Sequence, residues 1–195
     1  DQSNWEQGVA VPVDAVDDLI DDGDQSCVVQ TVVSSADAHY AGIAAADVTT
    51  TVQDDGDTAG VIVSTKALTV SEPSSSQTYT VVLTSEPAMQ VTLTMTPANS
   101  QCSATKSLLF TAANWQIPQT VVVTAVDDRI VDGARLCTLN TAATSGDSGY
   151  HGIVVAPVAV TVQDDGDTAG ILVTPATLNL SEPTGQATIA FALTS

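Results

Sequence analysis

The sequence repeats itself, and this repeat limits the folds open to the chain more than any other feature. The decapeptide TVQDDGDTAG occurs at Thr51–Gly60 and again, letter for letter, at Thr161–Gly170, an offset of 110 residues. The same offset aligns about 39 of the 85 overlapping positions without a gap. A regular period indicates that one structural unit occurs more than once along the chain.

The two decapeptides mark the boundaries between units, and we call them the first joint (Thr51–Gly60) and the second joint (Thr161–Gly170). Residues 58–167 then form one complete unit. Residues 1–57 correspond to the second half of a preceding unit, and residues 168–195 to the beginning of a following one. We expect either a segment of a longer array or a protomer whose partial ends complete each other between chains.

Apolar and polar residues alternate with a period of two inside the complete unit, as Tyr79–Leu83 and Val91–Met95 illustrate. This alternation predicts half-buried antiparallel strands, whereas no stretch has a convincing helical pattern. Further strands are expected near residues 60–63, 67–70, 107–111, 119–126, 135–141 and 153–162. Seven or so strands in about 110 residues fit an all-β, Ig-like antiparallel sandwich of two sheets.

Tyr40 and Tyr150 are related by the same offset and each precedes a glycine by two residues. They are candidates for a tyrosine corner, in which the hydroxyl of a tyrosine binds backbone and ties one connection of the sandwich in place. The alternative is that both are ordinary core tyrosines.

The three cysteines also follow the repeat, because Cys27 corresponds to Cys137 and the equivalent of Cys102 falls outside the sequence. Each whole unit would therefore hold two cysteines. We predict a Cys102–Cys137 disulfide, with Cys27 left without its partner. A disulfide indicates an oxidising, extracytoplasmic location. The alternative is a pair of buried free thiols.

Acidic residues dominate the charge, with 4 Lys and Arg against 23 Asp and Glu and a net charge of −19. No basic patch is present, so we expect no binding to nucleic acid. No apolar run approaches the roughly 20 residues of a membrane span, so we expect no membrane insertion. Fifteen of the acidic residues form four clusters: Asp14, Asp17, Asp18, Asp21, Asp22 and Asp24; Asp54, Asp55 and Asp57; Asp127, Asp128 and Asp132; and Asp164, Asp165 and Asp167.

Like charges at this density repel one another, and a metal cation is the simplest means of neutralising them. Ca²⁺ takes about 6 to 8 oxygen ligands from carboxylates, carbonyls and water. If the strands run as in a sandwich, one end of the complete unit gathers Glu72, Asp127, Asp128, Asp132, Asp164, Asp165 and Asp167. We predict that Ca²⁺ binds there, and at the matching cluster that ends at Asp57, and stiffens the joints. The alternative is that these residues form solvated turns.

The acidic loops of the two units differ at four positions. Asp21 and Asp24 correspond to Val131 and Ala134, and Leu19 and Gln25 correspond to Arg129 and Arg135. The loop of the complete unit thus loses two carboxylates and gains two cations. It is expected to bind fewer ions, or to bind them more weakly, if the guanidinium groups point inward.

Several motifs of the complete unit together resemble the Calx-β domain family. They are Ser71-Glu72-Pro73, the segment from Phe110 to Trp115, AVDDRIVDG at Ala125–Gly133, Tyr150 with Gly152, and the closing VTVQDDGD. Such domains occur in sodium/calcium exchangers and, as long arrays, in extracellular adhesion proteins. The resemblance implies a β-sandwich with Ca²⁺ at one end, bound by Glu72, Asp127, Asp128, Asp132, Asp164 and Asp165, by Asp17, Asp18, Asp22, Asp54 and Asp55 in the preceding unit, and by Glu182 in the following one.

Enzymatic activity is not expected. Gly146–Gly149 spells GDSG, the tetrapeptide around the nucleophile of serine proteases, but its equivalent Ala36–His39 contains no hydroxyl. A serine nucleophile also needs a histidine base held by an aspartate, and the two histidines are not equivalent in the repeat.

These features predict a non-enzymatic, extracellular or cell-surface protein that serves as a structural repeat of an adhesin, stalk or filament. Its expected partners are neighbouring repeats or identical chains, the latter joined by completing split domains. The alternative is a ligand-binding module, such as a calcium sensor or a carbohydrate-binding domain.

Overall fold

The computed structural model describes residues 5–195, and every regular element in that range is a β-strand. In β5 (Ser76–Leu83) and β6 (Val91–Pro97), the apolar side chains at alternate positions are buried and those between them are partly or fully exposed. Successive side chains of a strand point to opposite faces, so the alternation gives each strand one face for the core. The described residues contain no helix able to cross a membrane.

The strands between Val61 and Gln163 form a sandwich of two sheets. The five-stranded sheet has the order β4 (Ala67–Ser71), β11 (Val158–Gln163), β10 (Arg135–Ser145), β6 and β8 (Ser107–Phe110). The four-stranded sheet has the order β3 (Val61–Val63), β5, β9 (Gln119–Ala125) and β7 (Cys102–Ala104). β4 and β11 pair in parallel, and the other neighbouring strands are antiparallel.

The hydrophobic core lies between these two sheets. Phe110 and Val160 of the five-stranded sheet and Val121 and Val123 of the four-stranded sheet are fully buried in one cluster. Every buried apolar side chain of the described range falls between residues 70 and 162. Residues 5–195 therefore contain one packed all-β sandwich, and the predicted fold class is confirmed at that level.

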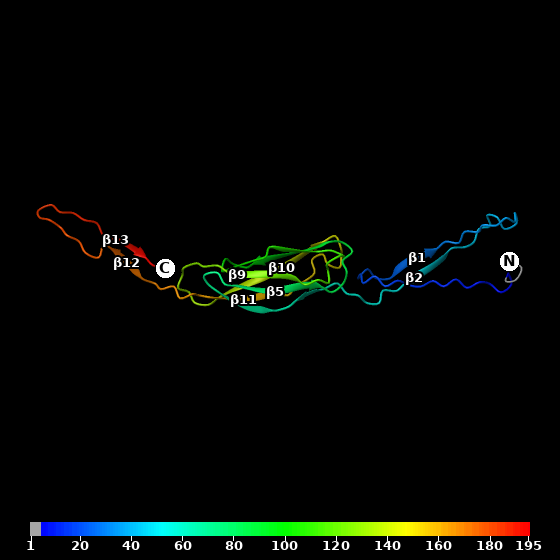
Figure 1. Ribbon diagram of the computed structural model, residues 1–195, viewed down its shortest axis with the longest axis horizontal. Helices are drawn as coiled ribbons and strands as arrows, with labels where there is room; N and C mark the ends of the chain where they lie inside the picture. Colours follow the sequence, from blue (N-terminus) through cyan, green and yellow to red (C-terminus); the bar gives the residue numbers. More distant parts are fainter. Residues whose placement is uncertain (1–4) are drawn as a thin grey trace.

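A two-stranded hairpin lies on each side of the sandwich, and Figure 1 shows the hairpins at opposite ends of an elongated molecule. They are β1 (Gln25–Val29) with β2 (Val48–Val52), and β12 (Ile171–Thr174) with β13 (Ala190–Leu193). The first pairs Gln25 with Val52, as β10 pairs Arg135 with Val162 at positions 110 residues later. The division of the chain into repeated domains stays a prediction.

Two of the expected strand boundaries were wrong, and one strand was missed. β11 begins at Val158 instead of near residue 153, and β10 continues to Ser145 instead of ending near residue 141. β7 was not predicted, because three residues are too few to display a period. The other strands lie within a few residues of the predicted ranges.

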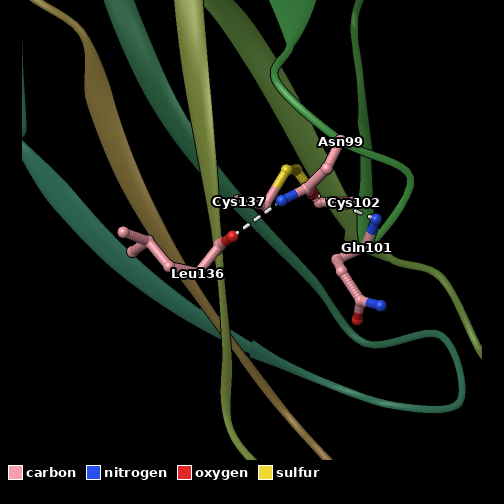
Figure 2. Close-up of a disulfide and its surroundings, with 5 residues drawn as sticks. All are labelled: Asn99, Gln101, Cys102, Leu136 and Cys137. Carbon is pink, nitrogen blue, oxygen red and sulfur yellow. Dashed lines mark hydrogen bonds between the residues drawn. A yellow bond between two sulfur atoms is a disulfide. The ribbon is translucent and has the colours of Figure 1, made fainter. Parts of the chain in front are cut away.

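The predicted disulfide is present and joins the two sheets (Figure 2). Cys102 lies at the start of β7 in the four-stranded sheet, and Cys137 lies in β10 of the five-stranded sheet. Both are buried. Next to them, the side-chain amide of Asn99 donates to the carbonyl oxygen of Leu136 at 2.9 Å. Cys27 is exposed and free.

Tyr150 forms the predicted tyrosine corner. Its hydroxyl donates to the carbonyl oxygen of Ser85 at 2.7 Å and accepts from the Ser85 amide at 3.1 Å. Ser85 comes two residues after β5, whereas Tyr150 lies between β10 and β11, so the contact ties a connection of one sheet to the end of the other. Tyr40, its equivalent, is 61% exposed.

Candidate metal sites

Parallel pairing of β4 with β11 brings Glu72 and Asp164 to the same end of the sandwich. Ser71 pairs with Gln163, and each is the last residue of its strand. The amide of Glu72 donates to the carbonyl oxygen of Gln163 at 2.9 Å. Glu72 and Asp164 are therefore the first residues beyond two adjacent strand ends.

The acidic loop between β9 and β10 reaches this end as well. β10 runs antiparallel to β11, so its first residue, Arg135, lies opposite Val162 near the second joint. The amide of Gly133 donates to Asp164 Oδ2 at 3.0 Å, and the amide of Gly166 donates to Asp164 Oδ1 at 3.0 Å. Asp164 thus fastens the acidic loop to the joint.

Three carboxylates converge here, because Glu72, Asp164 and Asp165 each place an oxygen within 4.8 Å of the others. Glu72 is only 8% exposed. Its charged neighbours are aspartates, and no group among the described residues donates a hydrogen bond to its carboxylate. A buried, unpaired carboxylate is unfavourable unless a cation or donor compensates it. An all-oxygen set around such a group fits Ca²⁺.

The surroundings shift the pKa values of Glu72 and Asp164 in opposite directions. Burial raises the pKa of Glu72, and repulsion from Asp128 and the other nearby aspartates raises it further. Hydrogen bonds from two glycine amides lower the pKa of Asp164. Asp164 is thus stabilised in its ionised form by the protein itself, whereas the surroundings of Glu72 disfavour its charge.

Asp167 belongs to the same acidic end. Its Oδ2 atom is buried and has no hydrogen-bond partner in the described part of the chain. Burial raises the pKa of Asp167, repulsion from Asp165 and Asp127 adds to this, and Arg129 acts in the opposite direction. Arg129 therefore already supplies part of the positive charge that a cation would bring.

Two further carboxylates of the loop are bound by other side chains. Arg135 Nε donates to Asp132 Oδ2 at 2.7 Å, so one of the two added arginines does point into the acidic loop. The side-chain amide of Gln101 donates to Asp128 Oδ2 at 2.7 Å. No sequence pattern pointed to Gln101, because it directly precedes β7, the strand that was not predicted.

The first joint has a close acidic group of its own, formed by Asp17, Asp55 and Asp57, whose oxygens lie within 4.8 Å of one another. Burial raises the pKa of Asp57, and repulsion from Asp55 raises it further. Asp54 accepts hydrogen bonds from two glycine amides at 3.0 Å each, which lower its pKa as in the equivalent Asp164. The hydrogen bonds of Asp54 and Asp164 therefore recur with the repeat, whereas the two close groups have only one equivalent pair in common, Asp55 and Asp165.

The other predicted ligands belong to neither close group. They are Asp18, Asp22 and Asp54 at the first joint, Asp127, Asp128, Asp132 and Asp167 at the second joint, and Glu182 beyond it. Most of these lie in the loops that carry the groups, but Glu182 is exposed on the C-terminal segment.

A cleft of about 480 Å³ lies between residues 14–27 and residues 52–57. Seven aspartates line it: Asp14, Asp17, Asp18, Asp22, Asp54, Asp55 and Asp57. No aromatic side chain does so. Its chemistry suits cations, and it offers no stacking surface for a sugar ring.

Comparison with known proteins assigns no family. No protein-family model and no curated protein match the chain. Among solved structures, the periplasmic chaperone SfaE is 12% identical with a TM-score of 0.44 over 55% of this chain, which spans 59% of the chaperone's length. The apo form of the Calx CBD1 domain is 13% identical with a TM-score of 0.42, covering 54% of this chain and 96% of that domain. WR4, a C. elegans MSP family member, is 8% identical with a TM-score of 0.35, covering 53% of this chain and 96% of WR4.

Proposed function

We propose that the chain is a non-enzymatic, extracellular structural segment of a surface adhesin, stalk or filament, built from tandem Calx-β-like sandwiches whose joints bind Ca²⁺. The observation that carries the proposal is the convergence of Glu72, Asp164 and Asp165 at the end of the sandwich where the chain passes into the next segment. The disulfide between Cys102 and Cys137 supports an oxidising location.

A cation at this end would act on the joint directly. Glu72 follows β4 inside the sandwich, and Asp165 lies in the second joint itself, two residues after β11. A cation that binds both carboxylates adds its binding free energy to the arrangement that holds them together. At a concentration 100 times its Kd, this stabilisation is about 2.7 kcal/mol.

Calorimetric titration of the 195-residue chain with Ca²⁺ tests the proposal. The double variant Glu72→Gln with Asp165→Asn is expected to lose the heat from the second joint and to keep the heat from the first. Glu182→Gln is the matched control, because Glu182 is equivalent to Glu72 in the repeat but is exposed and joins neither group. No heat from the parent at millimolar Ca²⁺ would show that the joints are solvated turns.

Stiffening needs its own measurement. Small-angle X-ray scattering of the parent chain is expected to give a narrower distribution of particle lengths with Ca²⁺ than with a chelator. Binding heat with an unchanged distribution would leave a calcium-binding module, the alternative function, as the better description. The absence of aromatic side chains in the acidic cleft gives no support to a carbohydrate-binding version of that alternative.

Assembly by split domains is less well supported than joints within one array. The partial ends of two chains correspond to residues 58–85 and 111–167 of the complete unit, so a domain assembled from them would lack the equivalents of β6, β7 and β8. β6 lies inside the five-stranded sheet, between β10 and β8. Its absence would expose a strand edge and the core face beneath it.

A further inference from the structure

The segment before the first joint contacts the sandwich through its backbone as well as through its charges. The amide of Glu86 donates to the carbonyl oxygen of Leu19 at 2.9 Å, and Ile20 forms an isolated parallel bridge with Glu86. The amide of Ala59 donates to Asp21 Oδ2 at 2.8 Å. Three consecutive residues, 19–21, therefore dock onto two sites of the sandwich that lie 27 residues apart in sequence.

The shape of this loop follows from a single residue in a left-handed conformation. Leu19 has φ of 62°, which costs a non-glycine residue about 1–2 kcal/mol. The turn is held by Asp18, whose Oδ1 accepts from the amide of Ile20 at 3.1 Å. The same turn recurs at the second joint, where Arg129 has φ of 57° and Asp128 Oδ1 accepts from Ile130 at 3.0 Å.

The two loops share this backbone conformation but differ in the hydrogen bonds that they can accept from the following segment. Val131 occupies the position of Asp21 and has no acceptor in its side chain. Ala169 occupies the position of Ala59, and no hydrogen bond of its amide occurs within residues 5–195. At the first joint, the carbonyl of Leu19 accepts a hydrogen bond from the amide of Glu86. The carbonyl of Arg129 can accept the equivalent bond at the second joint.

We infer that the loop Asp18–Asp21 is a docking surface for the following unit that works without metal, and that residue 21, or 131 in the next unit, sets how firmly the two units are held. Its partner is the segment that enters the following sandwich at Ala59, just before β3, together with the turn after β5 at Glu86. The inference rests on the proposed array of units and is independent of calcium. It makes successive joints unequal: the first is held by two contacts, and the second lacks the carboxylate contact.

The hydrogen bond from Ala59 to the Asp21 carboxylate is stronger than the one from Glu86 to the Leu19 carbonyl, because the carboxylate is charged. A hydrogen bond from an amide to a carboxylate is shorter and stronger than one to a neutral carbonyl. Asp21 also stands outside the close group of Asp17, Asp55 and Asp57, so its replacement leaves that candidate metal site intact. The dock and the metal site are therefore separable by substitution.

Amide hydrogen exchange, followed by NMR on the 195-residue chain in chelator, tests the dock. In the parent, the amides of Ala59 and Glu86 are expected to be protected. Asp21→Val, which copies the second joint, is expected to lower the protection of Ala59 by about ten-fold, the effect of losing one charge-assisted hydrogen bond. In Asp21→Asn, which keeps a neutral acceptor, the protection of Ala59 is expected to lie between that of the parent and that of Asp21→Val.

Two control variants make the result specific. Asp14→Thr removes one charge from the same cluster by introducing the residue found at position 124, and it is expected to leave Ala59 unchanged. Val131→Asp is expected to create protection at Ala169. Core amides of β9 report in each variant that the sandwich is still folded.

The possible outcomes separate this inference from the proposed function. Protection of Ala59 that is equal in the parent, Asp21→Val and Asp14→Thr would overturn the dock, as would protection that arises only after Ca²⁺ is added. A Val131→Asp variant without protection at Ala169 would overturn the role of this position at the second joint. Protection in chelator, together with no calcium-binding heat, would support the dock and refute the calcium joint.

Discussion

Tyr150→Phe is expected to destabilise the sandwich strongly although it removes a single oxygen atom. The hydroxyl is both a donor to the Ser85 carbonyl and an acceptor from the Ser85 amide. Ser85 and Tyr150 are each 1% exposed, so water has no access to replace the lost partner. The substitution leaves the aromatic ring and its packing in place, and its effect therefore reports on the hydrogen bonds alone.

The magnitude follows from counting the groups left without partners. A buried donor or acceptor without a partner costs about 1–3 kcal/mol. Two backbone groups of Ser85 lose their partner, and the Ser85 hydroxyl, 2.9 Å from the tyrosine oxygen, loses a contact as well. Partial relaxation lowers the upper limit, so we expect a loss of about 2–4 kcal/mol in the free energy of unfolding.

Urea unfolding of the intact chain measures this loss, with fluorescence of Trp115, which packs against the core, as the probe. Tyr40→Phe is the matched control: it makes the same chemical change at the equivalent position, where the side chain is 61% exposed. The control is expected to change stability by less than about 0.5 kcal/mol. A Tyr150→Phe effect as small as that of the control, at an unchanged m-value, would refute the reasoning.

Three further predictions concern the disulfide and the acidic end. Replacing Cys102 and Cys137 together by serine, which opens a link across a sequence separation of 35 residues, should lower the free energy of urea unfolding by about 3–4 kcal/mol; equal stability of the parent with and without reductant would contradict this. Calcium affinity should fall as pH falls through the raised pKa of Glu72, because Ca²⁺ must displace its proton, and calorimetry at several pH values should find a weaker early decline in Glu72→Gln. In the metal-free protein the sign is opposite: Glu72 favours the fold in its protonated form, and that contribution is lost as pH rises through its raised pKa. Arg135→Gln restores the residue of the preceding unit and should release Asp132 from its ion pair. Calcium affinity should then rise about two- to five-fold, which is the range expected for a partly exposed ion pair. An unchanged calcium titration curve would count against this prediction.

Much of the sandwich was predictable because its information is local. Alternation in Tyr79–Leu83 and Val91–Met95 reports directly which side chains face the core, and the structure buries those side chains. The disulfide was predictable for a different reason. The repeat assigned Cys27 to the position of Cys137, which left Cys102 as the remaining candidate partner in the complete unit.

Pairing between distant strands could not be obtained in this way. The parallel alignment of β4 with β11 joins residues about 92 positions apart, and this alignment decides that Glu72 meets Asp164. The sequence predicted that the acidic residues gather at one end, but it could not say which of them approach closely. Gln101 escaped prediction for the same reason, because its contact with Asp128 depends on where β7 lies.

The joints show why an identical sequence does not produce an identical site. The decapeptides of the two joints have the same ten residues, and Asp54 and Asp164 make the same hydrogen bonds. The differences come from residues outside them, in the loops that precede β1 and β10. An arginine binds Asp132 in one loop, whereas Asp21 binds the following segment in the other. The shared decapeptide therefore gives Asp54 and Asp164 the same hydrogen bonds, and the variable loop before it makes the contacts that differ between the two ends of the sandwich.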